Sequence, residues 1–241
     1  MPIESAPGAV SGCCLSYREQ RYVALRQIIP DIRVRLYENV EPELLRAAGA
    51  DFVYLTEEYT GQMTAALADV YPYAEKARSH RDLTERFYSK YPILDVTDIG
   101  AVKSGEYTDV WVHRVRVAVP GSGTLNLYCC HLPHDTDLRI SIVEAILKDI
   151  DTVGGKAIVG GDLNSLSLSK PVRKLLGAGL KDAWMRKGRG FGATFHGLRV
   201  GIRIDYIFHT KDLKLLDISR ISGSGISDHD ALLAEFALGK R

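Results

Sequence analysis

The sequence predicts an α/β fold in which mixed sheets are covered by helices. Short runs rich in Val, Ile, Leu, Tyr and Phe, bounded by Gly, Pro or Asp, alternate with amphipathic helical stretches. A turn signal at residues 120–123 lies between two strand-like runs and indicates a hairpin, which argues against a purely parallel sheet. The length of 241 residues and the hydrophobic content of 46% suit one globular domain spanning 1–241.

Seven segments have the composition of strands, because each is short, apolar and bounded by turn-forming residues. They are 32–37, 51–56, 110–119, 124–130, 156–160, 204–209 and 231–237.

Four stretches are predicted to be helices: 41–48, 61–69, 137–153 and 171–176. The third has the clearest pattern, because Leu138, Ile142 and Ile146 recur at helical spacing on one face. Pro42 and Pro171 each stand near a predicted helix start, where the missing N–H costs little.

Charge and hydropathy exclude some classes of protein. The net charge is +1 and the pI is about 7.7, so no global basic field of a dedicated nucleic-acid binder is present. No run approaches the 18 apolar residues of a membrane span, so none is expected. The first residues lack a secretory signal, so the cytoplasm is the default location and export would require a signal removed earlier. A monomer is expected.

The four cysteines form two adjacent pairs, Cys13–Cys14 and Cys129–Cys130. Neighbours on a strand point to opposite faces, so neither pair resembles a metal knuckle. Buried thiols in strands are the preferred interpretation, and a bridge between the pairs is the alternative in an exported protein.

Asp, Asn, Glu and His residues that could bind metal or transfer protons lie at the ends of the predicted strands. The apolar run 156–160 leads into Gly161, Asp162 and Asn164. On an extended chain, residues two apart face the same way, so the carboxylate of Asp162 and the amide of Asn164 are expected to point at one spot. An Asx turn after a strand is the structural alternative.

Two further clusters follow this pattern. Asp205 starts an apolar strand, and a carboxylate in such surroundings needs a partner or a role. Asp228 and His229 precede the last strand. Asp205 is the expected partner of His229, because a buried carboxylate orients an imidazole for acid–base chemistry, and Asp228 is then free to bind a metal ion. Solvated polar loops are the alternative for each.

Three more candidates lie at strand ends: His131, Glu57 and Asn39. His134 lies three residues beyond His131 and is given no role. A structural histidine, a helix-start acid and a loop amide are the ordinary interpretations. Because several strands end in ligand-type residues, a shared site is favoured, and oxygen ligands without cysteine suit Mg²⁺ or Mn²⁺.

These motifs, in this order, resemble the endonuclease/exonuclease/phosphatase superfamily, which includes DNase I-like nucleases, deadenylases and inositol-polyphosphate phosphatases. The motifs are Asn and Glu at 39 and 57, His-Leu at 131–132, Gly-Asp-Leu-Asn at 161–164, Arg-Ile-Asp-Tyr-Ile-Phe at 203–208 and Ser-Asp-His at 227–229. The resemblance covers about 34–238. It implies a four-layer α/β/β/α sandwich of two mixed, mainly antiparallel sheets, with 1–30 as an atypical N-terminal segment.

The resemblance also implies roles for the site residues. Mg²⁺ or Mn²⁺ would be held by Glu57 and Asp228 with help from Asn39. A second alignment places the first strand at 10–16, where the strand end is Ser16-Tyr17 and the family asparagine is missing; Asn39 is preferred.

The catalytic residues that the resemblance implies surround the phosphate. Asp162 and Asn164 would position the attacking water and a phosphate oxygen. His229, paired with Asp205, would contact the scissile phosphate, and His131 the phosphate or the leaving group.

The expected activity is metal-dependent hydrolysis of a phosphate ester, with nucleic acid (DNA or RNA) as the favoured substrate. The segment 184–189, which combines Trp184 with three basic residues, favours nucleic acid, although a solvated basic loop explains it equally well. A phosphatase or phosphodiesterase acting on a lipid or a small phosphorylated molecule is one alternative. A non-catalytic module that binds a phosphorylated ligand is another.

Overall fold

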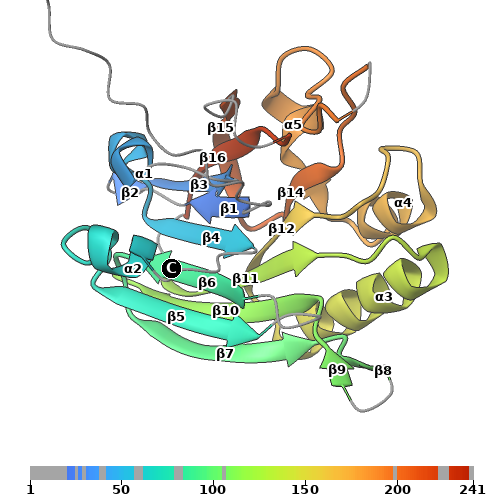
Figure 1. Cartoon of the computed structure of the whole chain (residues 1–241), viewed down its shortest axis with the longest axis horizontal. Helices are drawn as coiled ribbons and strands as arrows, with labels where there is room; N and C mark the ends of the chain where they lie inside the picture. The colour runs from blue at the N-terminus through green and yellow to red at the C-terminus, as the bar shows by residue number, and fades with distance from the viewer. Residues whose placement is uncertain are drawn as a thin grey trace, which may run out of the picture.

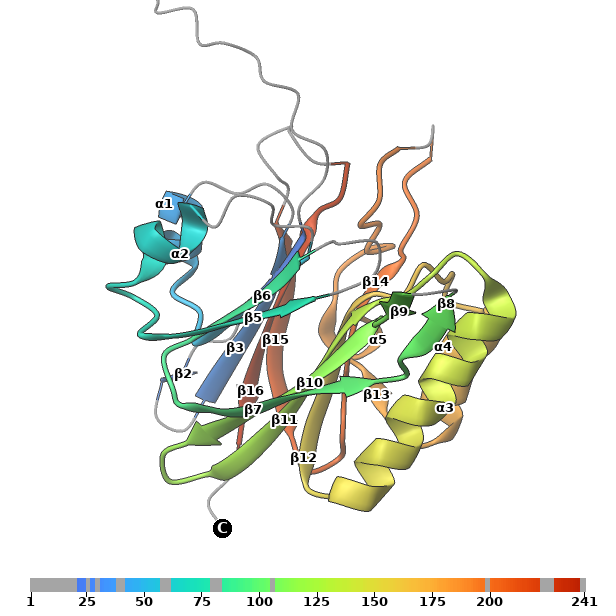
Figure 2. The ribbon, with the colours of Figure 1, turned by 60° about the horizontal axis from the view of Figure 1, so that its bottom comes forward.

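A computed structural model describes residues 21–24, 27–28, 31–37, 42–56, 62–78, 84–104, 107–197, 200–221 and 228–238. In these residues the chain forms four layers, with two sheets packed face to face and helices on both outer sides (Figures 1 and 2). This is the four-layer α/β/β/α sandwich that the sequence predicted.

The first sheet has eight strands, in which β15, β16, β1, β4, β3 and β2 follow one another and β6 joins β4 to β5. These strands are β1 (Arg21–Ala24), β2 (Gln27–Ile28), β3 (Asp31–Tyr37), β4 (Phe52–Thr56), β5 (Tyr73–Arg78), β6 (Thr84–Ser89), β15 (Lys214–Ile221) and β16 (Ala231–Ala237).

The second sheet has six strands in the order β13-β14-β12-β11-β10-β7, and it carries most of the site described below. These strands are β7 (Ile93–Ile99), β10 (Val112–Val119), β11 (Gly123–His131), β12 (Lys156–Asp162), β13 (Lys181–Asp182) and β14 (Asp205–His209). A separate small hairpin contains β8 (Val102–Ser104) and β9 (Tyr107–Asp109).

The helices cover the outer faces of the two sheets. They are α1 (Pro42–Ala48), α2 (Gln62–Leu67), α3 (Thr136–Val153), α4 (Lys170–Gly177) and α5 (Ala183–Lys187). Leu45 of α1 and Leu67 of α2 pack on the eight-stranded sheet. Ile142 of α3 and Val172 of α4 pack on the six-stranded sheet. None of the helices in the described ranges is long and apolar enough to cross a membrane.

The main core lies between the sheets, as the burial of alternate strand residues requires. Phe52, Tyr54 and Phe87 contribute from the eight-stranded sheet, and Leu127 and Ile158 from the other. The central strand β12 is buried on both faces over most of its length, because Ile158 packs in the core between the sheets and Val159 packs in the cluster under α3 and α4.

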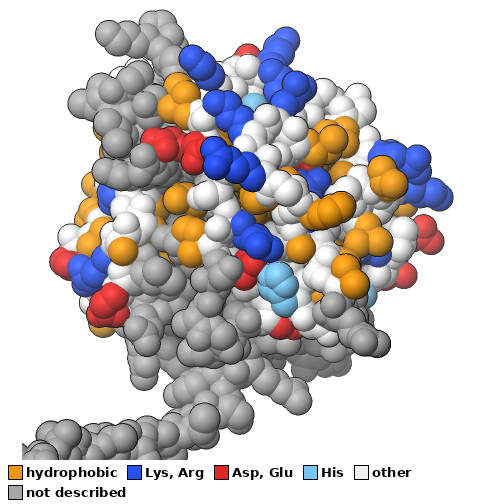
Figure 3. All heavy atoms as spheres, turned by 90° about the horizontal axis from the view of Figure 1, so that it is seen from above, with side chains coloured by type: hydrophobic (Ala, Val, Ile, Leu, Met, Phe, Trp, Pro, Cys, Tyr) orange, Lys and Arg blue, Asp and Glu red, His pale blue; other side chains and the backbone are white. Residues whose placement is uncertain are grey.

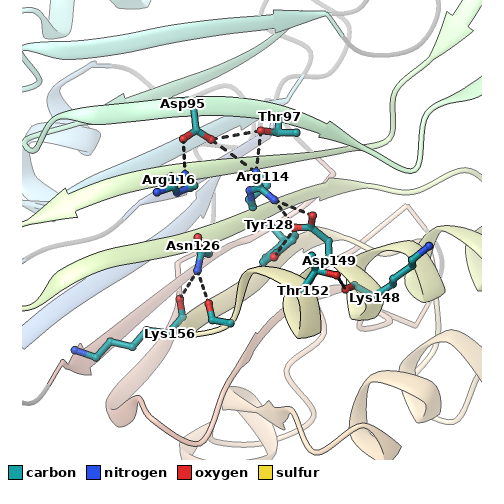
Figure 4. Close-up of polar contacts among 11 residues, drawn as sticks. Asp95, Thr97, Arg114, Arg116, Asn126, Tyr128, Lys148, Asp149, Thr152 and Lys156 are labelled. Atoms are coloured by element: carbon teal, nitrogen blue, oxygen red, sulfur yellow. Dashed lines mark hydrogen bonds and ion pairs between the residues drawn. The ribbon is translucent and has the colours of Figure 1, made fainter.

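Polar contacts fasten α3 to the outer face of the six-stranded sheet (Figure 4). Asp149 of α3 accepts two hydrogen bonds from Arg114, at 2.8 and 2.7 Å, and one from the hydroxyl of Tyr128 at 2.7 Å. Burial, followed by the bond to Asp149, raises the pKa of Tyr128. Asp135 caps the start of the helix, and its side chain accepts a hydrogen bond from the backbone N–H of Leu138 at 2.7 Å. The helix α3 is therefore held at its N-terminus by this cap and in its second half by Asp149.

All seven predicted strands and all four predicted helices are present, with ends shifted by at most a few residues. The hairpin at 120–123 joins β10 to β11 with Gly121 at φ 72°, a conformation that favours glycine. The sequence missed the other nine described strands and α5. Three of these strands, β5, β7 and β15, lie at sheet edges and carry polar residues on their exposed faces, so their apolar pattern is interrupted.

Cys129 and Cys130 are buried free thiols, as preferred from the sequence, and burial raises the pKa of both well above the usual value. Cys13 and Cys14 lie outside the described residues, as do the alternative first strand 10–16 and most of the atypical segment 1–30.

Candidate active site

Three of the predicted residues lie side by side at one end of the six-stranded sheet. His131 on β11 is in register with Asp162 on β12, and Asp162 is in register with Asp205 on β14. Residues in register on neighbouring strands point to the same face, about 5 Å apart. All three are buried. The row follows the neighbouring strands β11, β12 and β14 in Figure 1.

Gly161 allows the strands to approach each other beneath this row. Its φ is 138°, and a Cβ there would lie 1.9 Å from the carbonyl oxygen of Cys130 on β11. A side chain at this position would therefore force β12 away from β11, next to Asp162.

His229 is attached to this row by Asp205. The distance from His229 Nδ1 to Asp205 Oδ2 is 2.8 Å, and both side chains are buried. Because a carboxylate only accepts hydrogen bonds, Nδ1 donates to it, and Nε2 is the nitrogen left to face other groups. The Phe195 ring packs edge-on against the imidazole, with ring centroids 4.9 Å apart. Thr194 Oγ1 accepts a hydrogen bond from the backbone N–H of Asp205 at 3.1 Å and holds this strand start.

Asp162 and Asn164 are joined by a turn and not by an extended strand. The backbone N–H of Asn164 donates to Asp162 Oδ1 at 2.7 Å, and Asn164 has φ 45°. The expectation that both side chains point the same way along one extended strand was therefore wrong, because β12 ends at Asp162 and an Asx turn follows it. Asn164 Nδ2 donates to the carbonyl of Leu132 at 2.7 Å, which links the loops after β11 and β12.

Asp228 is the one predicted metal ligand within the described residues, since Asn39 and Glu57 lie outside them. Its Oδ1 atom is buried and accepts no hydrogen bond from the described part of the chain. A buried carboxylate oxygen left in this state suits a cation. The described residues contain no group of three or more His, Cys, Asp or Glu side chains that could hold a metal ion, so a complete site would need ligands outside them.

A cavity of about 450 Å³ opens beside these residues. Four of its lining residues are polar: His134, Asn164, Asp228 and His229. The other four are apolar: Leu166, Phe195, Ile202 and Ile204. The cavity can therefore take a charged group and an organic substituent together.

Sequence analysis gave His134 no role, although the structure places it on the cavity wall with His229. Its only signal was its position three residues after His131, in the loop after a strand end. His131 itself is buried and packs edge-on against Trp111, with ring centroids 6.5 Å apart.

Two arginines without a predicted role, Arg203 and Arg139, support the loops of the site. Arg203 makes a buried two-point contact with Asp182, at 3.0 and 2.8 Å, and stacks over Tyr206 at 4.6 Å. The Tyr206 hydroxyl donates to the carbonyl of Ser165 at 2.8 Å, and burial raises the pKa of Tyr206 to about 12. Arg139 holds the loop after β11 and is considered below.

The segment 184–189 combines a buried aromatic residue with three exposed basic residues. Trp184 belongs to α5, is buried in the core and donates a hydrogen bond through Nε1 to Gly190 at 3.1 Å, so its ring offers no stacking face. Arg186, Lys187 and Arg189 of the same segment are exposed.

Comparisons with known proteins agree on the fold. The model of the endonuclease/exonuclease/phosphatase family matches residues 42–229. No curated protein sequence matches the chain at a significant level.

Among solved structures, an endonuclease/exonuclease/phosphatase from Bacteroides vulgatus has a TM-score of 0.66 and 19% identity, covering 82% of this chain and 88% of its own. A mannosyl-6-phosphatase from Bacteroides thetaiotaomicron has a TM-score of 0.62 and 15% identity over 81% and 88%. The human nocturnin catalytic domain with a bound sulfate anion has a TM-score of 0.65 and 16% identity over 90% and 96%. At these identities the likeness shows the fold alone.

Proposed function

Because the chain belongs to the endonuclease/exonuclease/phosphatase family, whose members are generally phosphoester hydrolases, we propose that it is a metal-dependent phosphodiesterase acting on nucleic acid. The observation that carries the proposal is the row of His131, Asp162 and Asp205, with His229 held at 2.8 Å from Asp205. Of this group, His229 lines the cavity, together with Asn164 from the turn after Asp162. A buried acid–base pair beside a cavity is a common arrangement in catalytic sites.

The residues present fit a hard divalent cation. Asp228, with its buried oxygen free of described hydrogen bonds, would hold it together with Glu57 and Asn39. When bound, Mg²⁺ or Mn²⁺ would offset the negative charge of the phosphate.

The protein side chains would activate the water and bind the phosphate. Asp162 would orient the attacking water and accept its proton. His229, whose positive charge Asp205 stabilises, would donate a hydrogen bond from Nε2 to a phosphate oxygen. Asn164, fixed by its bond to the Leu132 carbonyl, would hold the loop that faces the phosphate. His131 would contact the phosphate from the neighbouring strand.

Nucleic acid is favoured as the substrate by charge outside the cavity. Arg186, Lys187 and Arg189 are exposed, and no ion pair within the described residues neutralises them. Figure 3 shows the molecule from above Figure 1, which is the side on which α5 lies. Lys and Arg side chains are more prominent than Asp and Glu side chains on this face. Phosphate backbones are attracted to such surfaces without regard to sequence. The apolar residues of the cavity lining, which include Phe195 and Ile202, suit a sugar or base next to the phosphate.

The test is hydrolysis of bis-p-nitrophenyl phosphate with Mg²⁺ or Mn²⁺, with and without EDTA. We expect turnover that EDTA abolishes. Asp162→Asn and His229→Gln should each lower kcat by at least about 100-fold. Asp151→Asn, an exposed change on α3, is the matched control and should keep the wild-type rate. Turnover that survives EDTA, or equal rates in all variants, would refute the proposal.

A phosphomonoesterase is the second candidate, since one structural neighbour is a mannosyl-6-phosphatase. The two activities are separated by comparing p-nitrophenyl phosphate with the diester, and then plasmid DNA with mannose 6-phosphate. A binding module without catalysis would retain a phosphorylated ligand in the presence of EDTA and hydrolyse neither ester.

A further inference from the structure

A phosphodiester needs a proton for its leaving oxygen, and the cavity offers few groups that can supply one. Among the described residues that line it, only His134, Asp228 and His229 can transfer a proton, because Asn164 carries an amide and the remaining lining residues are apolar. Asp228 is assigned to the cation, and His229, which Asp205 holds through Nδ1, is assigned to a phosphate oxygen through Nε2.

His134 is the remaining group. It is exposed on the cavity wall, so it can exchange protons with solvent between turnovers. His131, three residues earlier, is buried and is not among the residues that line the cavity. His134 is therefore the histidine of this loop that lines the cavity.

The loop that carries His134 is held firmly. Arg139 of α3 donates to the carbonyl of His134 at 3.1 Å, to Thr136 Oγ1 at 2.9 Å and to the carbonyl of Asp135 at 3.3 Å. The same guanidinium donates to Ser165 Oγ at 3.2 Å, in the loop that follows Asn164. Arg139 thus connects the loop after β11 to the loop after β12 and fixes His134 relative to the phosphate-facing residues.

We propose that His134 is a catalytic residue that protonates the leaving oxygen, with Arg139 as its positioning residue. The inference rests on the proposed function. Water oxygen forms a bond to phosphorus as the bond from phosphorus to the leaving oxygen breaks. The water loses one proton to Asp162, and the leaving oxygen takes one from the imidazolium of His134. The products are an alcohol and a phosphate monoester, and solvent returns the proton to His134.

The test uses two substrates that differ only in the leaving group, the p-nitrophenyl and unsubstituted phenyl esters of thymidine 5′-phosphate. p-Nitrophenolate leaves without protonation, whereas phenolate benefits from an acid. For His134→Gln we expect kcat with the phenyl ester to fall about 100-fold and the rate with the p-nitrophenyl ester to change by less than about 3-fold. Asp137→Asn, an exposed change in the same helix start, should leave both rates unchanged.

Equal losses with the two esters, or no loss with the phenyl ester, would overturn the role of His134. Arg139→Lys gives a second measurement, because lysine cannot bridge the two loops. It should reproduce the selective loss with the phenyl ester, and an equal loss with both esters would overturn the positioning role. If the wild-type chain hydrolyses neither ester with either metal, the proposed function itself fails.

Discussion

The Asp205–His229 pair gives the sharpest test of the site. Asp205→Asn keeps the shape of the side chain and removes its charge. The two groups are 2.8 Å apart and buried. With charge centres about 4 Å apart and an effective dielectric constant of about 20, the carboxylate stabilises a charged imidazole by about 4 kcal/mol. If His229 is charged in the transition state, losing that stabilisation lowers kcat by about 10³-fold.

The assay is kcat for bis-p-nitrophenyl phosphate at saturating Mg²⁺, measured for Asp205→Asn, His229→Gln and the double variant. Because the two residues act as a unit, the double variant should be no slower than the slower single variant. Circular dichroism and thermal unfolding would check that each variant remains folded. A folded Asp205→Asn variant within about threefold of the wild-type rate would refute the reasoning, and so would losses that multiply in the double variant.

Three further predictions concern the frame of the site. Gly161→Ala should destabilise the chain by more than about 2 kcal/mol in urea unfolding, because a Cβ there would lie 1.9 Å from the backbone of Cys130. An unchanged unfolding midpoint would contradict the close approach of β12 to β11 at this position. Asp149→Ala should cost about 3 kcal/mol, since it leaves the buried Tyr128 hydroxyl and an arginine without their acceptor. Asp151→Ala on the same helix should cost less than about 0.5 kcal/mol. Similar losses of stability in the Asp149 and Asp151 variants would show that the hydrogen bonds of Asp149 do not stabilise the fold. Mg²⁺ at about 100 times its Kd should stabilise the wild-type chain by about 2.7 kcal/mol in thermal unfolding and Asp228→Asn by much less; equal shifts would remove Asp228 from the cation site.

The fold was predictable because its signals are local. The apolar run 156–160 and the periodic helix 137–153 identify their elements from composition alone. The pairing of Asp205 with His229 was predictable as well, since each stands next to a buried strand that brings it to the sheet end.

What could not be predicted depends on contacts between distant segments or on loop conformation. The contribution of Arg139 arises from a bond to Ser165, 26 residues away. The left-handed conformation of Asn164 contradicts the extended geometry that its spacing from Asp162 suggested. The burial of Trp184 follows from α5, a helix too short to show a periodic pattern. Asn39 and Glu57 lie outside the described residues and stay predictions.

The register that aligns His131, Asp162 and Asp205 ties catalysis to sheet assembly. A shift of one residue in the pairing of β12 would turn Asp162 to the opposite face and bring an apolar neighbour into its place. The alignment of these three side chains is therefore set by the hydrogen-bond ladder of the sheet and not by the loops. Insertions or deletions in the surrounding loops can change which substituent the cavity accepts while leaving the reacting row intact, so substrate preference can diverge in this fold without loss of its chemistry.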